Sequence, residues 1–393
     1  MENNKTPSIR FKGFTDPWEQ RKLNEIADKV TEKNAGLQYI ETFTNSAEFG
    51  IISQRDFFDH DIAKMSSLGG YYIVRNEDFV YNPRISTSAP VGPTNRNKLG
   101  RIGVMSPLYT VFRPHDVDTT YLEYFFKSKY WHSFMNFNGD SGARSDRFSI
   151  KDSVFFEMPI PLPYTEEQEK IGQYFSNLDN LITLHQRKYN KLLNVKKSML
   201  EKMFPKNGSN IPEIRFKGFT DPWEQRKVFE IADRFDNLRV PVAANLRIPG
   251  NTPYYGANGI QDYVEGYTHD GEYILVAEDG ASDLKNYPVN YVNGRIWVNN
   301  HAHVLQGKEK IANNKFLSYA MRLADIESVL VGGGRAKLNA DIMMNLDIAI
   351  PSFNEQEQIG AYFSNLDNLI TLHQRELEKL QNIKKSMLEK MFV

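Results

Sequence analysis

The sequence predicts an α+β fold with two β-rich globular domains separated by two long antiparallel coiled-coil helices, in a pseudo-two-fold internal repeat. Three observations lead to this prediction. Residues 167–204 recur almost unchanged at 355–392, and the shorter block 9–22 recurs without a change at 214–227. Between the repeats, short alternating or aromatic runs are separated by Gly, Asn and Pro, a pattern typical of β-strands.

The order of the repeats divides the chain into two halves joined by a linker. Each half begins with the short block, continues through a variable globular region and ends in the long repeat. At 393 residues the chain is too long for a single core. The predicted segments are a disordered lead-in at 1–8, globular domains at 9–164 and 214–353, long helices at 165–204 and 354–393, and a flexible linker at 205–213.

Each copy of the long repeat is predicted to form one helix. Apolar residues follow alternating steps of four and three, which is heptad spacing, and no proline interrupts them. A helix of about 38 residues is roughly 57 Å long and needs an equally long partner, which is the other copy. Because the midpoints of an antiparallel pair meet, the two central histidines are expected near each other. The expected helix-pair contacts are Phe175, Leu178, Ile182 and His185 with Phe363, Leu366, Ile370 and His373.

The short repeated block predicts a turn followed by a helix. Asp16-Pro17 and its copy Asp221-Pro222 are turn signals. A short amphipathic helix is expected to begin near Trp18 in the first copy and near Trp223 in the second.

The two globular regions share no obvious sequence, but their predicted elements come in the same order. Each has several expected strands and one late helical run, near residues 121–134 and 315–330. The sequence GARSDRF at 142–148 aligns with GGGRAKL at 332–338, which places Arg147 and Lys337 at the same position. A constant framework around two dissimilar modules suggests one protein that recognises two different things.

Composition limits the possible classes of protein. The chain has no cysteine, which excludes disulfides, thiolate metal sites and a cysteine nucleophile. The first residues do not have the pattern of a secretory leader and no apolar run approaches 18 residues, so a soluble, cytoplasmic protein is expected. The net charge is −1, so a DNA-binding role would require locally clustered positive charge or a partner.

These repeats resemble the specificity (S) subunits of type I restriction–modification systems. The pattern EQ..IG..F..LD.LI...QR followed by KK..L.KMF occurs in both halves, and the resemblance covers essentially the whole chain. It implies that each globular region is a target-recognition domain that reads one half of a bipartite, asymmetric double-stranded DNA target. It also implies that the helices set the spacing and dock two modification subunits, which methylate adenine, while restriction subunits can join the complex.

The resemblance implies a chain that is not itself an enzyme. S-adenosylmethionine is expected on the methyltransferase partner, ATP and Mg²⁺ on the restriction partner, and no cofactor on this chain. The sequence agrees, because it has no phosphate-binding loop, glycine-rich cofactor turn or Asn-Pro-Pro-Tyr tetrapeptide. No catalytic residue is predicted.

The first domain has a long window without acidic residues, between Asp78 and Asp116. Such a loop suits phosphate contacts from Lys and Arg and base contacts from Arg and Asn, although a solvated charged loop is the simpler alternative. Cations that follow the glycine turns could approach a phosphate closely, or the turns could simply connect helix to strand. The DNA-binding candidates of this domain are Asn82, Arg84, Arg96, Lys98, Arg101, Arg144 and Arg147.

The second domain has a shorter acid-free window, between Asp283 and Glu309. His301 and His303 at i, i+2 on a strand would point the same way and could hold a metal. No carboxylate lies close in sequence to complete the set, so hydrogen bonding or DNA contact is favoured and no metal is predicted. The DNA-binding candidates are Tyr254, Asn258, Lys285, Arg295, Asn300, His301, Arg335 and Lys337.

Two alternative functions stay open at this point. The first is a coiled-coil scaffold whose globular ends bind proteins. The second, less favoured, is a metal-dependent nuclease that uses Asp270, Asp283 and Lys285, although such triplets occur by chance in acidic, β-rich segments.

Overall fold

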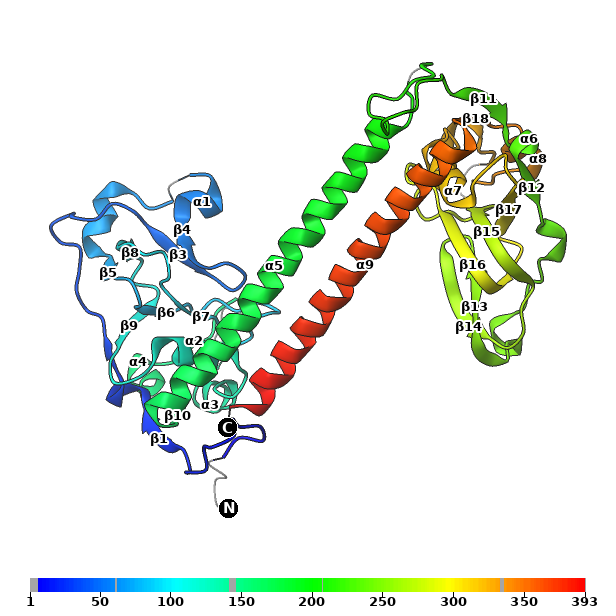
Figure 1. Cartoon of the computed structure of the whole chain (residues 1–393). Helices are drawn as coiled ribbons and strands as arrows, with labels where there is room; N and C mark the ends of the chain where they lie inside the picture. The colour runs from blue at the N-terminus through cyan, green and yellow to red at the C-terminus, as the bar shows by residue number, and fades with distance from the viewer. Residues whose placement is uncertain (1–5, 61, 141–145, 207, 333–335, 393) are drawn as a thin grey trace. The chain divides into compact units, whose positions relative to one another are not determined.

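The computed structural model describes residues 6–60, 62–140, 146–206, 208–332 and 336–392. The chain forms two compact units (Figure 1). Unit 1 comprises residues 1–186 and 375–393, and unit 2 comprises residues 187–374. Each unit therefore contains one globular region and parts of both long helices.

The main sheet of unit 1 has four strands in the order β2-β9-β6-β7, and three two-stranded sheets, β1-β10, β3-β4 and β5-β8, complete its β-structure. In chain order the elements are β1 (Glu19–Lys22), η1 (Leu23–Glu25), β2 (Ala27–Lys29), β3 (Phe43–Ser46), β4 (Gly50–Ser53), α1 (Gln54–Phe58), η2 (Met65–Gly70), β5 (Tyr72–Val74), β6 (Phe79–Tyr81), β7 (Thr94–Arg96), β8 (Gly103–Met105), β9 (Thr110–Pro114), α2 (Thr119–Lys127), α3 (His132–Asn138), α4 (Asp152–Phe155) and β10 (Pro159–Leu162).

The main sheet of unit 2 has six strands in the order β12-β17-β15-β16-β13-β14, and β11 pairs separately with β18. In chain order the elements are β11 (Glu224–Lys227), α6 (Val228–Ile231), β12 (Ala232–Arg234), η3 (Asp236–Leu238), η4 (Ala244–Leu246), β13 (Pro249–Gly256), β14 (Gly259–Val264), β15 (His269–Ala277), β16 (Val289–Val298), β17 (Ala302–Gly307), α7 (Asn314–Leu323), η5 (Glu327–Val329), α8 (Ala340–Met344) and β18 (Asp347–Ile350).

Four strands correspond between the two sheets although their sequences differ. The order β2-β9-β6-β7 matches β12-β17-β15-β16. The register matches as well, because β6 pairs with β9 through Phe79 and Phe112, and β15 pairs with β17 through Ile274 and Leu305. The prediction of an α+β chain with two globular domains is confirmed. The β13-β14 hairpin extends the sheet of unit 2, whereas β3-β4 and β5-β8 are additions of unit 1.

The two long repeats form α5 (Thr165–Met203) and α9 (Phe353–Lys390), of 39 and 38 residues. Within unit 1 the beginning of α5 lies against the end of α9, since the rings of Phe175 and Phe392 are 6.1 Å apart. Within unit 2 the end of α5 lies against the beginning of α9 in the same way, through Phe204 and Phe363. In each unit the two helix segments therefore run antiparallel. His185 and His373 belong to different units, so their predicted proximity stays a prediction.

The predicted helix seam is largely buried. Phe175 and Phe363 are fully buried and pack against aromatic residues of the globular regions as well as against the other helix. Leu178, Leu366, Ile370 and His373 are at least nine-tenths buried, while Ile182 and His185 are half-buried.

One buried ion pair between identical residues recurs in the two units. Arg10 donates two hydrogen bonds of 2.7 Å to Glu167, and Arg215 donates two of 2.7 Å to Glu355. Both carboxylates are fully buried. Each ion pair therefore fixes a short repeated block to the first turn of a long helix.

The glycine of each long repeat lets a helix of the globular region approach closely. A Cβ atom on Gly360 would lie 2.9 Å from the backbone nitrogen of Phe316, at the start of α7. A Cβ on Gly172 would lie 3.1 Å from Cβ of Thr120, at the start of α2. This close approach explains why each long repeat has a glycine in its IG sequence.

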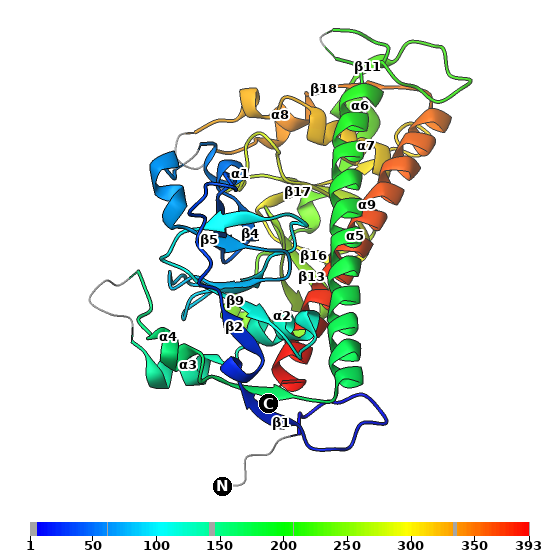
Figure 2. The ribbon, with the colours of Figure 1, turned by 90° about the vertical axis from the view of Figure 1, so that its left-hand side faces the viewer.

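The repeated KMF sequence completes a domain core in each unit. Phe392, just after α9, is buried against Tyr121 of α2 in unit 1. Figure 2 shows the end of α9 close to α2. Phe204, just after α5, stacks on Phe316 of α7 in unit 2, with ring centroids 5.5 Å apart. Each long helix thus begins in the core of one unit and ends in the core of the other.

The predicted helix after Trp18 and Trp223 is wrong. These residues lead into strands β1 and β11, which pair antiparallel with strands β10 and β18. The backbone N–H and C=O groups of β10 and β18 need hydrogen-bond partners, and β1 and β11 provide them. This strand pairing outweighs the local amphipathic pattern that favours a helix. Only the short turns η1 and α6 that follow the two strands are helical.

Candidate nucleic-acid interface

The loops at one end of each main sheet are held by the same backbone contact. In unit 1 the backbone nitrogen of Phe148 donates to the carbonyl of Pro83 at 2.7 Å, and in unit 2 that of Leu338 donates to Glu278 at 2.7 Å. Two isolated antiparallel bridges lie beside these bonds, one between Arg84 and Arg147 and one between Asp279 and Lys337. The equivalence of Arg147 and Phe148 with Lys337 and Leu338 is therefore confirmed at the level of the backbone, while the rest of the aligned segments lies largely outside the described residues.

In unit 1 this bridge places two arginines opposite each other. Directly opposite like charges repel. Arg84 is exposed and Arg147 half-buried, and neither side chain forms an ion pair with another residue of the described parts of the chain. Two arginines that face each other across a backbone bridge, with no carboxylate partner among the described residues, form a candidate site for a phosphate or a guanine edge. Arg144 lies outside the described residues.

Asn82 precedes the loop that carries Pro83 and Arg84. It is part of a group of asparagines that joins the β3-β4 hairpin to the main sheet. Its side-chain nitrogen donates to the carbonyl of Asn45 at 2.7 Å. Asn95 donates to the side-chain oxygen of Asn45 at 2.7 Å, and Asn45 itself is 1% exposed. Asn82 therefore positions the loop, and the sequence gives no signal for the central role of Asn45.

The remaining cations of the acid-free window pair with acids from other segments. Arg96 is 8% exposed and contacts Glu77 at 2.9 Å and Glu123 at 2.6 Å. Burial raises the pKa of Glu123, but the neighbouring cations, Lys127 first among them, hold it below its usual range. Arg96 is thus an interior residue, which corrects its assignment as a DNA contact.

Two more candidates of this window are exposed but paired. Lys98 lies 3.2 Å from Glu123, and Arg101 lies 2.8 Å from Glu41. An absence of acids nearby in the sequence therefore does not leave these cations free, because the fold supplies acids from elsewhere. Both can still exchange their carboxylate for a phosphate at the surface, since exposed ion pairs contribute little.

In unit 2 several loops meet at the corresponding end of the sheet. Asn258 joins two of them, because its side chain donates to the carbonyl of Gly280 at 2.9 Å and accepts from the nitrogen of Ser282 at 2.8 Å. Asp283 accepts hydrogen bonds from the backbone nitrogens of Lys285 and Asn286, which fixes the turn. Asn258 is therefore a positioning residue. Lys285, Asn300 and Lys337, which belong to the loops at this end of the sheet, are exposed.

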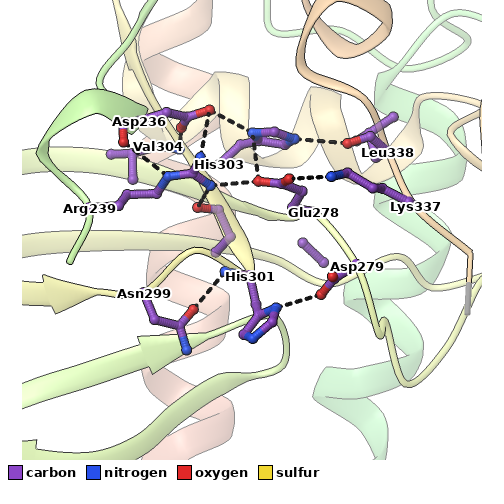
Figure 3. Close-up of polar contacts among 12 residues, drawn as sticks. Asp236, Arg239, Glu278, Asp279, Asn299, His301, His303, Val304, Lys337 and Leu338 are labelled. Atoms are coloured by element: carbon purple, nitrogen blue, oxygen red, sulfur yellow. Dashed lines mark hydrogen bonds and ion pairs between the residues drawn. The ribbon is translucent and has the colours of Figure 1, made fainter. Parts of the chain in front are cut away.

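His303 lies behind this surface in a buried polar network (Figure 3). Nδ1 lies 2.7 Å from a carboxylate oxygen of Asp236, and Nε2 lies 2.9 Å from the carbonyl oxygen of Leu338. The ring therefore lies between two hydrogen-bond acceptors. The ring fastens β17 to the segment that carries Lys337.

Glu278 connects the same network to two further cations. Arg239 donates to it at 2.6 Å, and Lys337 lies 2.9 Å away (Figure 3). Burial raises the pKa of Glu278, but the hydrogen bonds from Arg239 and Lys337 outweigh this and hold it below its usual range. Sequence reasoning missed Asp236, Arg239 and Glu278, since they lie far from the histidines along the chain.

His301 and His303 do not share a face as the i, i+2 spacing predicts. β17 begins at Ala302, so His301 lies in the preceding turn. Its Nδ1 lies 2.6 Å from Asp279, and its side chain is 35% exposed, against 2% for His303. Among the residues described, no group of three or more His, Asp or Glu side chains is arranged to hold a metal ion.

Two other candidates of unit 2 lie away from this surface. Tyr254 is 1% exposed and its hydroxyl bonds the backbone of Val242, which corrects its assignment as a DNA contact. Arg295 is exposed and lies 3.2 Å from Asp270, near the start of β15. Arg335 lies outside the described residues.

The nuclease triplet is not brought together. Asp270 is the second residue of β15, and Asp283 follows the opposite end of that strand. Seven residues of extended strand separate Asp270 from Ala277, about 23 Å at ~3.3 Å per residue.

In the part of the chain that the structure covers, no helix is long and apolar enough to cross a membrane.

Comparisons with known proteins place the chain in a family. The type I restriction modification DNA specificity domain matches residues 15–194 and 220–382. A putative type I restriction enzyme specificity subunit of Haemophilus influenzae is 44% identical over 154 residues, 39% of each chain. A type I restriction enzyme specificity subunit of Methanocaldococcus jannaschii is 24% identical over 74% of this chain and 73% of its own.

A solved S subunit of a type I restriction–modification system from M. genitalium shares the fold. The superposition has a TM-score of 0.61 and covers 99% of both chains at 15% identity. Because the family match includes most of both halves, the chain belongs to the family of type I restriction–modification DNA specificity domains.

Proposed function

We propose that this chain is the DNA-recognition subunit of a type I restriction–modification complex, in which each globular domain reads one half of a bipartite, asymmetric target. The observation that carries the proposal is the backbone bridge common to both domains. It presents Arg84 and Arg147 in unit 1, and Asp279 and Lys337 in unit 2. A common frame that presents different hydrogen-bonding groups is what reading two different sequences requires.

The long helices are the spacer of this subunit and the docking site for its partners. The near-identical sequences of α5 and α9 support a pseudo-two-fold arrangement in which the helices form an antiparallel coiled coil and His185 lies near His373. Leu184 and Leu372, at equivalent positions, are 59% and 52% exposed. Equivalent exposed leucines support the docking of two identical methyltransferase subunits, one on each helix.

Chemistry in the assembled complex belongs to the partners, and this chain is non-catalytic. The methyltransferase subunits bind S-adenosylmethionine and methylate adenine, which requires the base to be flipped out of the duplex. Restriction subunits, where present, use ATP and Mg²⁺. The complex works in the cytoplasm, where the DNA is.

A domain exchange tests the proposal. Residues 234–351 are replaced by the corresponding region of a different specificity subunit, and the methylated motif is mapped in a host that also carries the methyltransferase partner. One half of the motif changes and the other half stays. A motif altered in both halves contradicts independent reading, and assembly without any sequence-specific DNA binding supports the scaffold instead.

A further inference from the structure

The imidazole of His301 is held at one nitrogen and open at the other. Nδ1 lies 2.6 Å from Oδ1 of Asp279, whereas Nε2 has no partner among the residues that the structure describes. The backbone is fixed on both sides, because its nitrogen donates to the side chain of Asn299 at 2.8 Å and its carbonyl accepts from Glu278 at 2.9 Å. Figure 3 shows this ring apart from the buried network around His303.

Asp279 determines which group the open nitrogen offers. A carboxylate only accepts hydrogen bonds, so the proton of a neutral His301 ring lies on Nδ1 and Nε2 carries a lone pair. In the major groove, donors that fit a lone pair are the N6 amino group of adenine and the N4 amino group of cytosine. Guanine presents N7 and O6, and thymine presents O4, which are acceptors and repel it.

The surroundings of His301 favour DNA as the ligand. Asn300 beside it is exposed, and two cations near this surface, Lys285 and Lys337, are exposed as well. Lysines can contact phosphates while a neighbouring side chain reads a base edge. The carboxylate of Asp279 faces Nδ1 of His301, and the backbone of Asp279 lies opposite Lys337 in an isolated bridge.

We infer that His301 is a specificity-determining residue of the second domain, that its Nε2 accepts a hydrogen bond from the amino group of an adenine or a cytosine, and that Asp279 is the positioning residue that fixes its tautomer. The inference rests on the proposed function and goes further, because it names the hydrogen bond and the chemical group that is read.

The first experiment maps the methylated motif produced by this chain with its methyltransferase partner. His301→Ala relaxes one position in the half-site of the second domain, with roughly five- to tenfold less discrimination, the share of one hydrogen bond. Asp279→Asn relaxes the same position, since an amide can donate to Nδ1 as well as accept from it and no longer fixes one tautomer. The first half-site is unchanged in both variants.

A matched control is His115→Ala. His115 also places Nδ1 near a carboxylate, 2.9 Å from Asp116, and is 41% exposed. It follows β9 at the end of the unit 1 sheet opposite to Arg84, so this variant should leave both half-sites unchanged.

The second experiment measures binding of the assembled complex to duplexes that lack a single amino group. Purine in place of adenine, or a pyrimidinone in place of cytosine, weakens binding by wild type at the relaxed position by roughly five- to tenfold. The same replacement has no further effect on His301→Ala, because the partner atom is already gone. A comparison within one protein does not depend on how the substitution affects folding.

The outcomes separate the role of His301 from the proposed function of the chain. If wild type methylates a bipartite motif and His301→Ala methylates the same motif with the same discrimination, the role of His301 is refuted while the proposed function stands. The role of His301 is also refuted if removal of the amino group weakens DNA binding by the same factor in His301→Ala as in wild type. If wild type with its partner gives no bipartite motif, the proposed function itself fails.

Discussion

The two globular domains share a backbone bridge but carry very different side chains on it. The same bridge carries Arg84 and Arg147 in unit 1, and Asp279 and Lys337 in unit 2. The first pair has no acid partner in the described parts of the chain, whereas the second lies in a network of carboxylates, cations and histidines. The frame is thus fixed by hydrogen bonds of the backbone, and side chains on it can change without altering the fold.

The largest expected effect concerns the frame itself. Glu355→Ala leaves the guanidinium of Arg215 buried and without its carboxylate, which should cost about 3–5 kcal/mol of the free energy of unfolding. Glu167→Ala should cost more, because Glu167 also accepts from the indole nitrogen of Trp18 at 3.2 Å. The indole nitrogen of Trp223, its counterpart, has no hydrogen-bond partner among the described residues. Calorimetry or urea unfolding measures the difference.

A double variant is the control for this prediction. Arg215→Ala combined with Glu355→Ala removes both charges and should recover part of the loss, because no buried charge stays unpaired. A single Glu355→Ala variant as stable as wild type would show that this ion pair does not hold the helix to the repeated block.

How far the sequence could predict these features depends on their range. The long helices and the correspondence of Arg147 with Lys337 follow from repeats and local periodicity, and the structure confirms both. The strand after Trp18 could not be predicted, because its partner β10 lies about 140 residues later. The pairing of Arg96 with Glu123 was equally hidden, since it joins a strand to a helix.

The next effect concerns DNA binding and contrasts the two bridges. Arg84→Ala combined with Arg147→Ala removes two cations that have no acid partner in the described residues, and it should lower the slope of log affinity against log salt by up to about 1.8, at ~0.9 for each phosphate contact. Lys337→Ala should lower it by at most ~0.9, because its ammonium already contacts Glu278. Binding by the assembled complex at several salt concentrations gives both slopes. Slopes equal to that of wild type would exclude phosphate contacts at these positions.

A smaller effect separates the two helix glycines. Gly360→Ala should destabilise unit 2 by about 1–3 kcal/mol through overpacking, offset by up to about 1 kcal/mol of improved helix propensity. Gly172→Ala should be nearly neutral, since its added carbon would meet side-chain atoms of Thr120 and Asp118 at 3.1 Å and beyond rather than a backbone nitrogen at 2.9 Å. Thermal unfolding of both variants tests the contrast, and equal losses would mean that the closer contact relaxes without cost.

The smallest effect is the dependence of stability on pH. Burial raises the pKa of Asp236, but hydrogen bonds from His303 and from the backbone of Val304 outweigh burial and hold this pKa below its usual range. A carboxyl whose pKa is lowered by folding stabilises the fold above its unfolded pKa and loses this contribution as pH falls through the folded value. The free energy of unfolding of unit 2 should therefore decrease below about pH 5, and Asp236→Asn should be less stable at neutral pH but less sensitive to acid.

In unit 1 the pKa of Glu123 is also lowered, so Glu123→Gln is the matched variant that should flatten only the acid response of that unit. Urea unfolding between pH 7 and 3 measures these slopes, and an unchanged slope in Asp236→Asn would show that Asp236 does not link stability to protons.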